Sequence, residues 1–168
     1  MRTVIATLEA DLRKARATAE AAIAQVDDAQ LTSAPAGSNS IAVIVRHLAG
    51  NFVSRFTDFL TSDGEKPWRD RDGEFEDPTI TRDGLMTEWN RGWDVLMSSL
   101  ASLTDADLSR TVTIRGQSLT VLEALVRSFG HASLHIGQIV FLAKALRGDA
   151  WKTLTIPRGQ SKTFRPPS

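Results

Sequence analysis

The chain contains no cysteine among its 168 residues. This absence excludes disulfides, thiolate metal ligands, iron–sulfur clusters and a thiol nucleophile carried by the protein itself. Any thiol chemistry would therefore depend on a diffusible thiol. A chain without cysteine also fits a reducing compartment, and we expect a cytoplasmic protein.

An excess of charge and a long apolar run are absent as well. The 20 Lys and Arg residues balance the 20 Asp and Glu residues, so the formal net charge is zero. Because no basic stripe or polybasic segment stands out, we expect neither nucleic acid nor a membrane surface as a partner. The first residues, Met1 to Ala6, lack a long apolar core, and we expect neither a signal peptide nor a membrane span.

The length and the apolar content suit one folded unit. A chain of 168 residues can bury a full core without disulfides. We expect a single domain over residues 1–168, with a partly irregular tail from 149 to 168.

Apolar residues recur every three or four positions in four long segments, which is the spacing of amphipathic helices. Thr81 and Thr120 stand where two of these helices would begin, and Glu123 completes a capping-box pattern with Thr120. The pattern predicts an all-α fold with helices over residues 3–27, 41–61, 81–103 and 120–146.

The connections suggest how these helices are arranged. The link from Ser62 to Pro78 is long enough to let the second and third helices run parallel, which gives a four-helix bundle in up-down-down-up order. The link is either a plain crossover or a functional loop that covers a site. Alternation around Arg115 and Gly116 predicts a small β-hairpin before the last helix.

The chain has only three histidines, and their placement predicts a metal site. His131 and His135 are four residues apart, so both imidazoles lie on one face of the last helix. His47 lies near the middle of the second helix, which would run antiparallel to the last. Three His ligands leave an open position for water or substrate, and zinc or nickel is favoured, with iron also able to accept imidazole. The alternative is that the three histidines lie on the flanks of their helices and make ordinary hydrogen bonds.

Further polar residues are candidates for the same site. Asn51, Asp58 and Gln138 are expected on the metal-facing sides of their helices, where they would orient ligands or substrate. In the long link, Trp68 is expected to cover the open metal position and Arg69 to hold an anionic group of the substrate.

These residues resemble a known family. The pattern of His47 followed by Leu-Ala-Gly-Asn51, and of His131-x-x-x-His135-Ile-Gly-Gln138, resembles the DinB-like (YfiT-like) metalloenzyme superfamily. The segments at 64–69 and 156–161 are similar to a branch of unknown function. The resemblance implies a four-helix bundle with a divalent metal on the three histidines. It also implies a homodimer, because many members of the superfamily are dimers.

Two functions follow as hypotheses. The resemblance favours a metal-dependent enzyme, thiol S-transferase-like or hydrolase-like, in which the ion activates a small nucleophile such as a low-molecular-weight thiol or water. The alternative is a non-catalytic, stress-associated protein whose metal stabilises the bundle. Against that alternative, a structural zinc site normally has four protein ligands.

Overall fold

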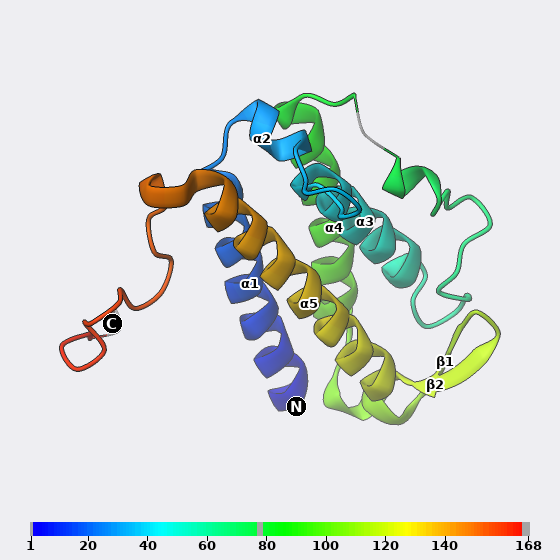
Figure 1. Ribbon diagram of the computed structural model, residues 1–168. Coiled ribbons are helices and arrows are strands. Elements are labelled where there is room, and N and C mark those ends of the chain that lie inside the picture. The colour runs from blue at the N-terminus through cyan, green and yellow to red at the C-terminus, as the bar shows by residue number, and fades with distance from the viewer. Residues whose placement is uncertain (1, 77–78, 166–168) are drawn as a thin grey trace.

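The protein is mostly helical in the computed structural model, which describes residues 2–76 and 79–165 (Figure 1). Pro78 and the last three residues, 166–168, lie outside the described residues. Within them the elements are α1 (Thr3–Ile23), α2 (Asp28–Thr32), α3 (Ile41–Phe56), η1 (Gly73–Phe75), α4 (Arg82–Ser102), η2 (Asp105–Ser109), β1 (Thr111–Ile114), β2 (Gln117–Thr120), α5 (Val121–Arg147) and η3 (Gly148–Ala150). The expected all-α class is confirmed, apart from the small sheet.

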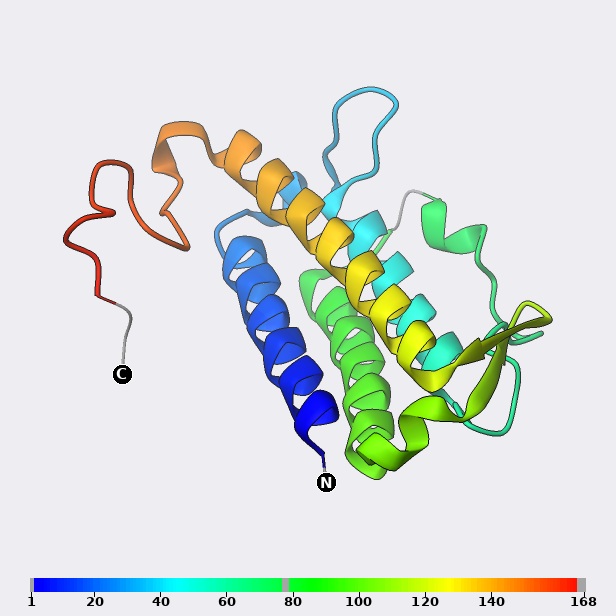
Figure 2. The ribbon, with the colours of Figure 1, turned by 90° about the horizontal axis from the view of Figure 1, so that it is seen from below.

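The four long helices pack against one another around a common apolar core. Helix α3 packs against α4 and α5, and α1 packs against α5 and α4 (Figures 1 and 2). Trp89 and Trp93 of α4 are fully buried, and the ring of Trp93 lies 5.0 Å from that of Phe52 of α3. The core therefore joins the helix that carries His47 to its neighbours.

Two small residues, Ala49 of α3 and Gly92 of α4, let these helices approach closely. A Cβ atom placed on Gly92 would lie only 2.7 Å from Cα of Ala49. Since the obstructing atom is backbone, no side-chain movement could make room for it. This contact fixes the position of α3 against α4 at Ala49, which lies between His47 and Asn51.

The first helix ends earlier than predicted. It stops at Ile23 rather than near residue 27, and the short helix α2 follows, which the sequence did not predict. Asp27 caps α2 through a capping box with Gln30. Arg82 of α4 donates hydrogen bonds to the carbonyl oxygens of Ile23 and Val26, at 3.2 and 2.7 Å, so the carbonyl groups at this turn have partners.

The helix α3 also ends early, at Phe56 instead of residue 61. Ser54 Oγ and Arg55 Nη1 both donate to the carbonyl oxygen of Gly64, at 2.8 and 2.6 Å. These bonds fold the long link back onto the last turn of the helix. Asp58, in the turn itself, has a left-handed backbone with φ of 50°.

The predicted hairpin is confirmed, and the long link is attached to it. Strands β1 and β2 are antiparallel, and the two residues between them, Arg115 and Gly116, have φ of 54° and 72°, as a type I′ turn requires. The carboxylate of Asp63 accepts hydrogen bonds from both of their backbone N–H groups, at 2.9 and 2.8 Å. The first part of the link is therefore held by both α3 and the hairpin.

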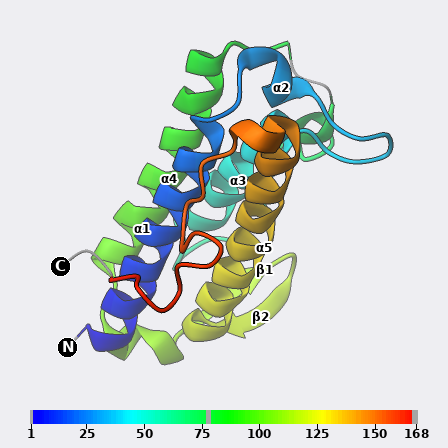
Figure 3. The same ribbon diagram turned by 60° about the vertical axis from the view of Figure 1, so that its left-hand side comes forward.

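The boundaries of the last two long helices agree closely with the sequence pattern. Thr81 caps α4, and Thr120 forms the expected capping box with Glu123 at the start of α5. The tail over 151–165 has no helix or strand among the described residues, and Figure 3 shows its irregular course. No described helix is long and apolar enough to span a membrane.

Candidate metal centre

The three histidines lie together, as the spacing predicted. His47 comes from α3, and His131 and His135 come from successive turns of α5. One ligand atom of each lies within 4.8 Å of the others, and the Nε2 atoms of His47 and His131 are 3.2 Å apart. Two imidazole nitrogens on one tetrahedral zinc, each at about 2.05 Å, are about 3.3 Å apart. The Nε2 atoms of His47 and His131 are therefore separated by the distance expected when both bind one ion.

The direction of each imidazole is set by a hydrogen bond on its other nitrogen. His47 Nδ1 donates to Glu74 Oε2 at 2.9 Å, and a carboxylate can only accept. His135 Nδ1 donates to the amide oxygen of Gln138 at 2.7 Å. Each ring therefore keeps its proton on Nδ1 and turns an Nε2 lone pair toward the common centre. Metal-ligating histidines are held in this way.

The third ring, His131, is half-buried. Its buried Nδ1 atom has no hydrogen bond within the described residues. Burial, with the positive charge that His135 and His47 would carry, lowers the pKa of His131 to about 4. Burial also lowers the pKa of His135. Both rings are therefore neutral at pH 7, and neutral imidazole is the form that binds a metal.

The donor set fits a divalent metal ion. Three neutral nitrogens suit zinc, nickel or iron, and the geometry does not distinguish among these elements. The three histidines are the cluster of potential metal-ligating side chains found among residues 2–76 and 79–165. They leave at least one coordination position for a ligand from outside the chain.

Glu74 is the site residue that sequence reasoning missed. It lies in η1 of the long link, and its side chain is 10% exposed. Arg69 binds both of its carboxylate oxygens, with Nε and Nη2 each at 2.8 Å. Burial alone would raise the pKa of Glu74, but the hydrogen bonds from His47 and Arg69 lower it below its usual value. Glu74 is thus an ionised carboxylate that links Arg69 to a histidine of the triad.

The link fits closely against α3 at this point. A Cβ atom on Gly50 would collide with the carboxylate of Glu74, so a larger residue would force the carboxylate to shift from this position. The ring of Phe75 lies 4.7 Å from the ring of His47 and covers it. A glycine three residues after a candidate ligand was the signal that could have pointed to a close contact here.

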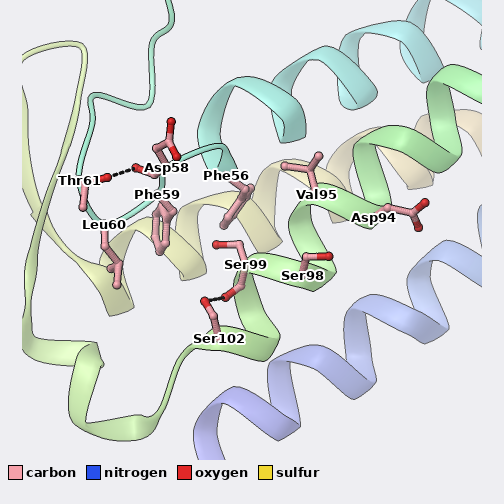
Figure 4. Close-up of a pocket in the computed structure, with 10 residues that line it drawn as sticks. All are labelled: Phe56, Asp58, Phe59, Leu60, Thr61, Asp94, Val95, Ser98, Ser99 and Ser102. Carbon is pink, nitrogen blue, oxygen red and sulfur yellow. Dashed lines mark hydrogen bonds between the residues drawn. The ribbon is translucent and has the colours of Figure 1, made fainter.

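The other predicted site residues are divided by the structure. Asn51 follows His47 by one turn, is buried and lines the same cavity as His47 and His131. Gln138 holds His135. Asp58 is exposed beyond the end of α3 and lines a separate hollow of about 500 Å³ with Phe56 and Val95 (Figure 4). The structure therefore brings Asn51 and Gln138 to the triad and separates Asp58 from it.

The two predicted residues of the link also lie apart. Trp68 is 57% exposed and lines a hollow on the α4 side of α3, beside Glu88 and Arg91. Arg69 is turned inward, with its side chain 3% exposed, and binds Glu74. Phe75, rather than Trp68, is the aromatic residue that packs against a histidine of the triad, His47, and a role of Trp68 in binding substrate stays a prediction.

The fold and the site together define a helical protein with a candidate three-histidine metal centre. Residues 2–160 match the model of the DUF1572 family, described as a protein of unknown function, and the chain belongs to this family. No curated protein and no solved structure matches the chain.

The role of Glu74 gives a first prediction. We expect Glu74→Gln to weaken metal binding by roughly 10- to 100-fold, because the amide no longer fixes the His47 tautomer and leaves Arg69 buried without its counter-charge. Competition with a chromogenic chelator measures the affinity. Glu88→Gln is the matched control, since Glu88 is half-exposed and lies 3.7 Å from Arg46. Equal affinities for the two variants would contradict the role of Glu74.

Proposed function

We propose that this protein is a metal-dependent enzyme of the DinB-like type, in which His47, His131 and His135 hold a divalent ion that activates a small nucleophile. The reaction is thiol S-transferase-like or hydrolase-like. The observation that carries the proposal is the tautomer pattern: Glu74 and Gln138 fix two rings so that their Nε2 lone pairs converge. The pairwise packing of the four long helices supports a bundle, and the courses of these helices in Figure 1 support the up-down-down-up order.

The chemistry of the bound ion is simple to state. When bound, a divalent ion lowers the pKa of a coordinated water to about 7 in favourable sites and deprotonates a coordinated thiol. Because the chain has no cysteine, the thiol must be diffusible. The residues of the chain then orient the ligands and shield the centre. Gln138 and Glu74 hold the rings of His135 and His47. Phe75 excludes water from one side of His47, and Asn51 presents an amide beside the centre.

Access to the centre favours an enzyme over a structural metal protein. A cavity of about 150 Å³ borders His47 and His131, so a small molecule can reach the histidines. Glu74, the nearest carboxylate, is occupied by His47 and Arg69 and is not free to act as a fourth ligand. The centre therefore keeps a position for an exogenous ligand, which a closed structural site would not.

Cobalt substitution tests the proposal. We expect cobalt(II) protein titrated with 2-mercaptoethanol to show a new sulfur-to-cobalt charge-transfer band in the near ultraviolet, because the thiol enters the open position. The His135→Ala protein is the control and should show no such band. A cobalt spectrum that stays unchanged at saturating thiol would support the structural alternative instead.

The lowered histidine pKa values predict how metal binding depends on pH. A group whose folded pKa lies below its usual value stays neutral until the pH falls toward the lowered pKa. We therefore expect metal affinity to be nearly constant from pH 8 to pH 7 and to be lost between about pH 6 and 4, where His135 and His131 bind protons. Elemental analysis after desalting at each pH measures the metal that the protein retains. A large loss between pH 8 and 7 would contradict the lowered pKa values.

We also infer a homodimer formed through α5. Leu122, Val126, Leu134 and Phe141 are 40, 54, 63 and 72% exposed and fall within one side of the helix, with the open glycines Gly130 and Gly137 between them. An exposed apolar helix face of this kind is typical of an interface. Light scattering of the purified protein should give twice the 18.4 kDa chain mass, and Phe141→Glu should give the chain mass.

A further inference from the structure

The cavity beside the triad has an unusual set of charges. It lies between α3, the long link, the hairpin turn and the first half of α5, and its volume is about 150 Å³. Five arginines from these four segments line it, and none of its lining residues is acidic. The lining residues that carry the argument are Arg55, Arg69, Arg71, Arg115, Arg127 and Asn51.

Carboxylates compensate only part of this positive charge. Arg55 and Arg115 share one carboxylate, that of Glu65, at 3.0 and 2.9 Å. Arg69 is bound by Glu74. These three arginines are therefore paired with only two carboxylates, those of Glu65 and Glu74. Burial lowers the pKa of Arg55, and the charges of Arg69 and Arg115 add to this effect.

The remaining two arginines are nearly uncompensated. Arg71 lies 3.9 Å from Asp72, whose side chain is fully exposed, so this pair is weak. Arg127 is exposed on α5 and forms no ion pair with any residue in the described ranges. An excess of positive charge around a small hollow attracts an anion.

An amide without a partner among the described residues is the second, independent observation. Asn51 is 9% exposed and lines the cavity. Its side-chain amide makes no hydrogen bond to any other described residue of the chain. Its amide atoms are not among the fully buried polar atoms without a partner, so they are open to the cavity. The amide is therefore available to a molecule that enters the cavity.

We propose that this cavity binds an oxyanion group of the substrate, a carboxylate or a phosphate, through Arg71, Arg127 and the amide of Asn51. The guanidinium groups match such oxyanions because their N–H donors form parallel pairs of hydrogen bonds. The volume is smaller than the roughly 300–1,000 Å³ of typical ligand sites, so the cavity takes the charged end of a substrate and not a whole large ligand.

The inference rests on the proposed function for the position of the reacting atom. His131 lines the cavity and belongs to the triad, so an oxyanion held there lies next to the metal centre. The substrates are then small carboxylates or phosphate esters whose reactive atom is a few bonds from the charge. The anion-binding role expected for Arg69 passes to Arg71 and Arg127, because Glu74 already occupies Nε and Nη2 of Arg69.

Calorimetric titration with inorganic phosphate and with succinate tests the proposal on the purified protein. At low salt we expect saturable binding of at least one of them, weakened by roughly 10- to 100-fold in Arg127→Gln and partly restored in Arg127→Lys. Arg13→Gln is the matched control, because Arg13 is exposed on α1 and pairs with Glu9. Binding of succinate alone identifies a carboxylate site, and binding of phosphate alone identifies a phosphate site.

Two results would overturn the proposal. One is the absence of binding of either anion to the parent protein, and the other is equal binding by the parent and Arg127→Gln. Metal content is measured on the same samples, and we expect it to be unchanged in Arg127→Gln. The titration is repeated after the metal is removed with a chelator, where the arginines should still bind the anion. Failure of the metal centre therefore does not hide the result for the cavity.

Discussion

The His135→Ala protein should be purified with less than about a tenth of the metal of the parent, which should carry about one divalent ion per chain. Removing one of three ligands leaves the imidazoles of His47 and His131, whose Nε2 atoms are 3.2 Å apart. Two ligands hold an ion far more weakly than three. The loss should exceed that of Glu74→Gln, because Glu74 acts only through His47. Elemental analysis of both proteins measures the difference.

The controls separate metal loss from misfolding. His135 is half-buried, and the only hydrogen bond of its side chain within the described residues is to Gln138, so we expect the variant to fold. Its circular dichroism spectrum should match that of the parent. Arg13→Ala, on the surface of α1, should keep the full metal content. Full occupancy in a folded His135→Ala protein would mean that the triad is not the metal site.

A second large effect is expected from Gly92→Ala. The new methyl group would meet the backbone of Ala49 at 2.7 Å and force α3 and α4 apart. We expect a loss of about 3 kcal/mol of unfolding free energy, at the upper end of the range for overpacked cores, and a fall in Tm of about 6–10 °C for a chain of this size. Differential scanning calorimetry measures both.

Gly130→Ala is the matched control for Gly92→Ala, with both changes made in the Phe141→Glu protein so that the α5 interface does not contribute. Gly130 also lies inside a long helix, but a Cβ atom there meets nothing within 4 Å. This change should therefore raise the stability by about 0.5–1 kcal/mol, the intrinsic preference of a helix for alanine over glycine. If both variants lost similar stability, close packing at Gly92 would not be the reason.

The cluster of three histidines could be foreseen from the sequence because its signal is short-ranged. The spacing of His131 and His135 puts them on one face of any helix, and the chain has only one other histidine, His47. The capping box at Thr120 set the start of α5, and the turn at Arg115 and Gly116 set the hairpin. These features depend on neighbours in sequence, and they agree with the structure.

The parts that could not be foreseen depend on contacts between distant residues. Glu74 lies 27 residues from His47, and the long link around it has no periodicity that would place its side chains. The early end of α3 results from the return of Gly64 to Ser54, which no local pattern encodes. The arginine-lined cavity likewise joins residues of α3, the link, the hairpin and α5, which only the fold brings together.

The contact of Glu74 with both Arg69 and His47 couples the conformation of the link to a candidate metal ligand. An ion that binds His47 would also favour the conformation of residues 69–75 in which Glu74 reaches that ring. Thermodynamic reciprocity then requires that an event in the link changes metal affinity by the same factor as the metal changes that event. A substrate that draws Arg69 away from Glu74 would loosen the ion, and one that tightens the link would retain it.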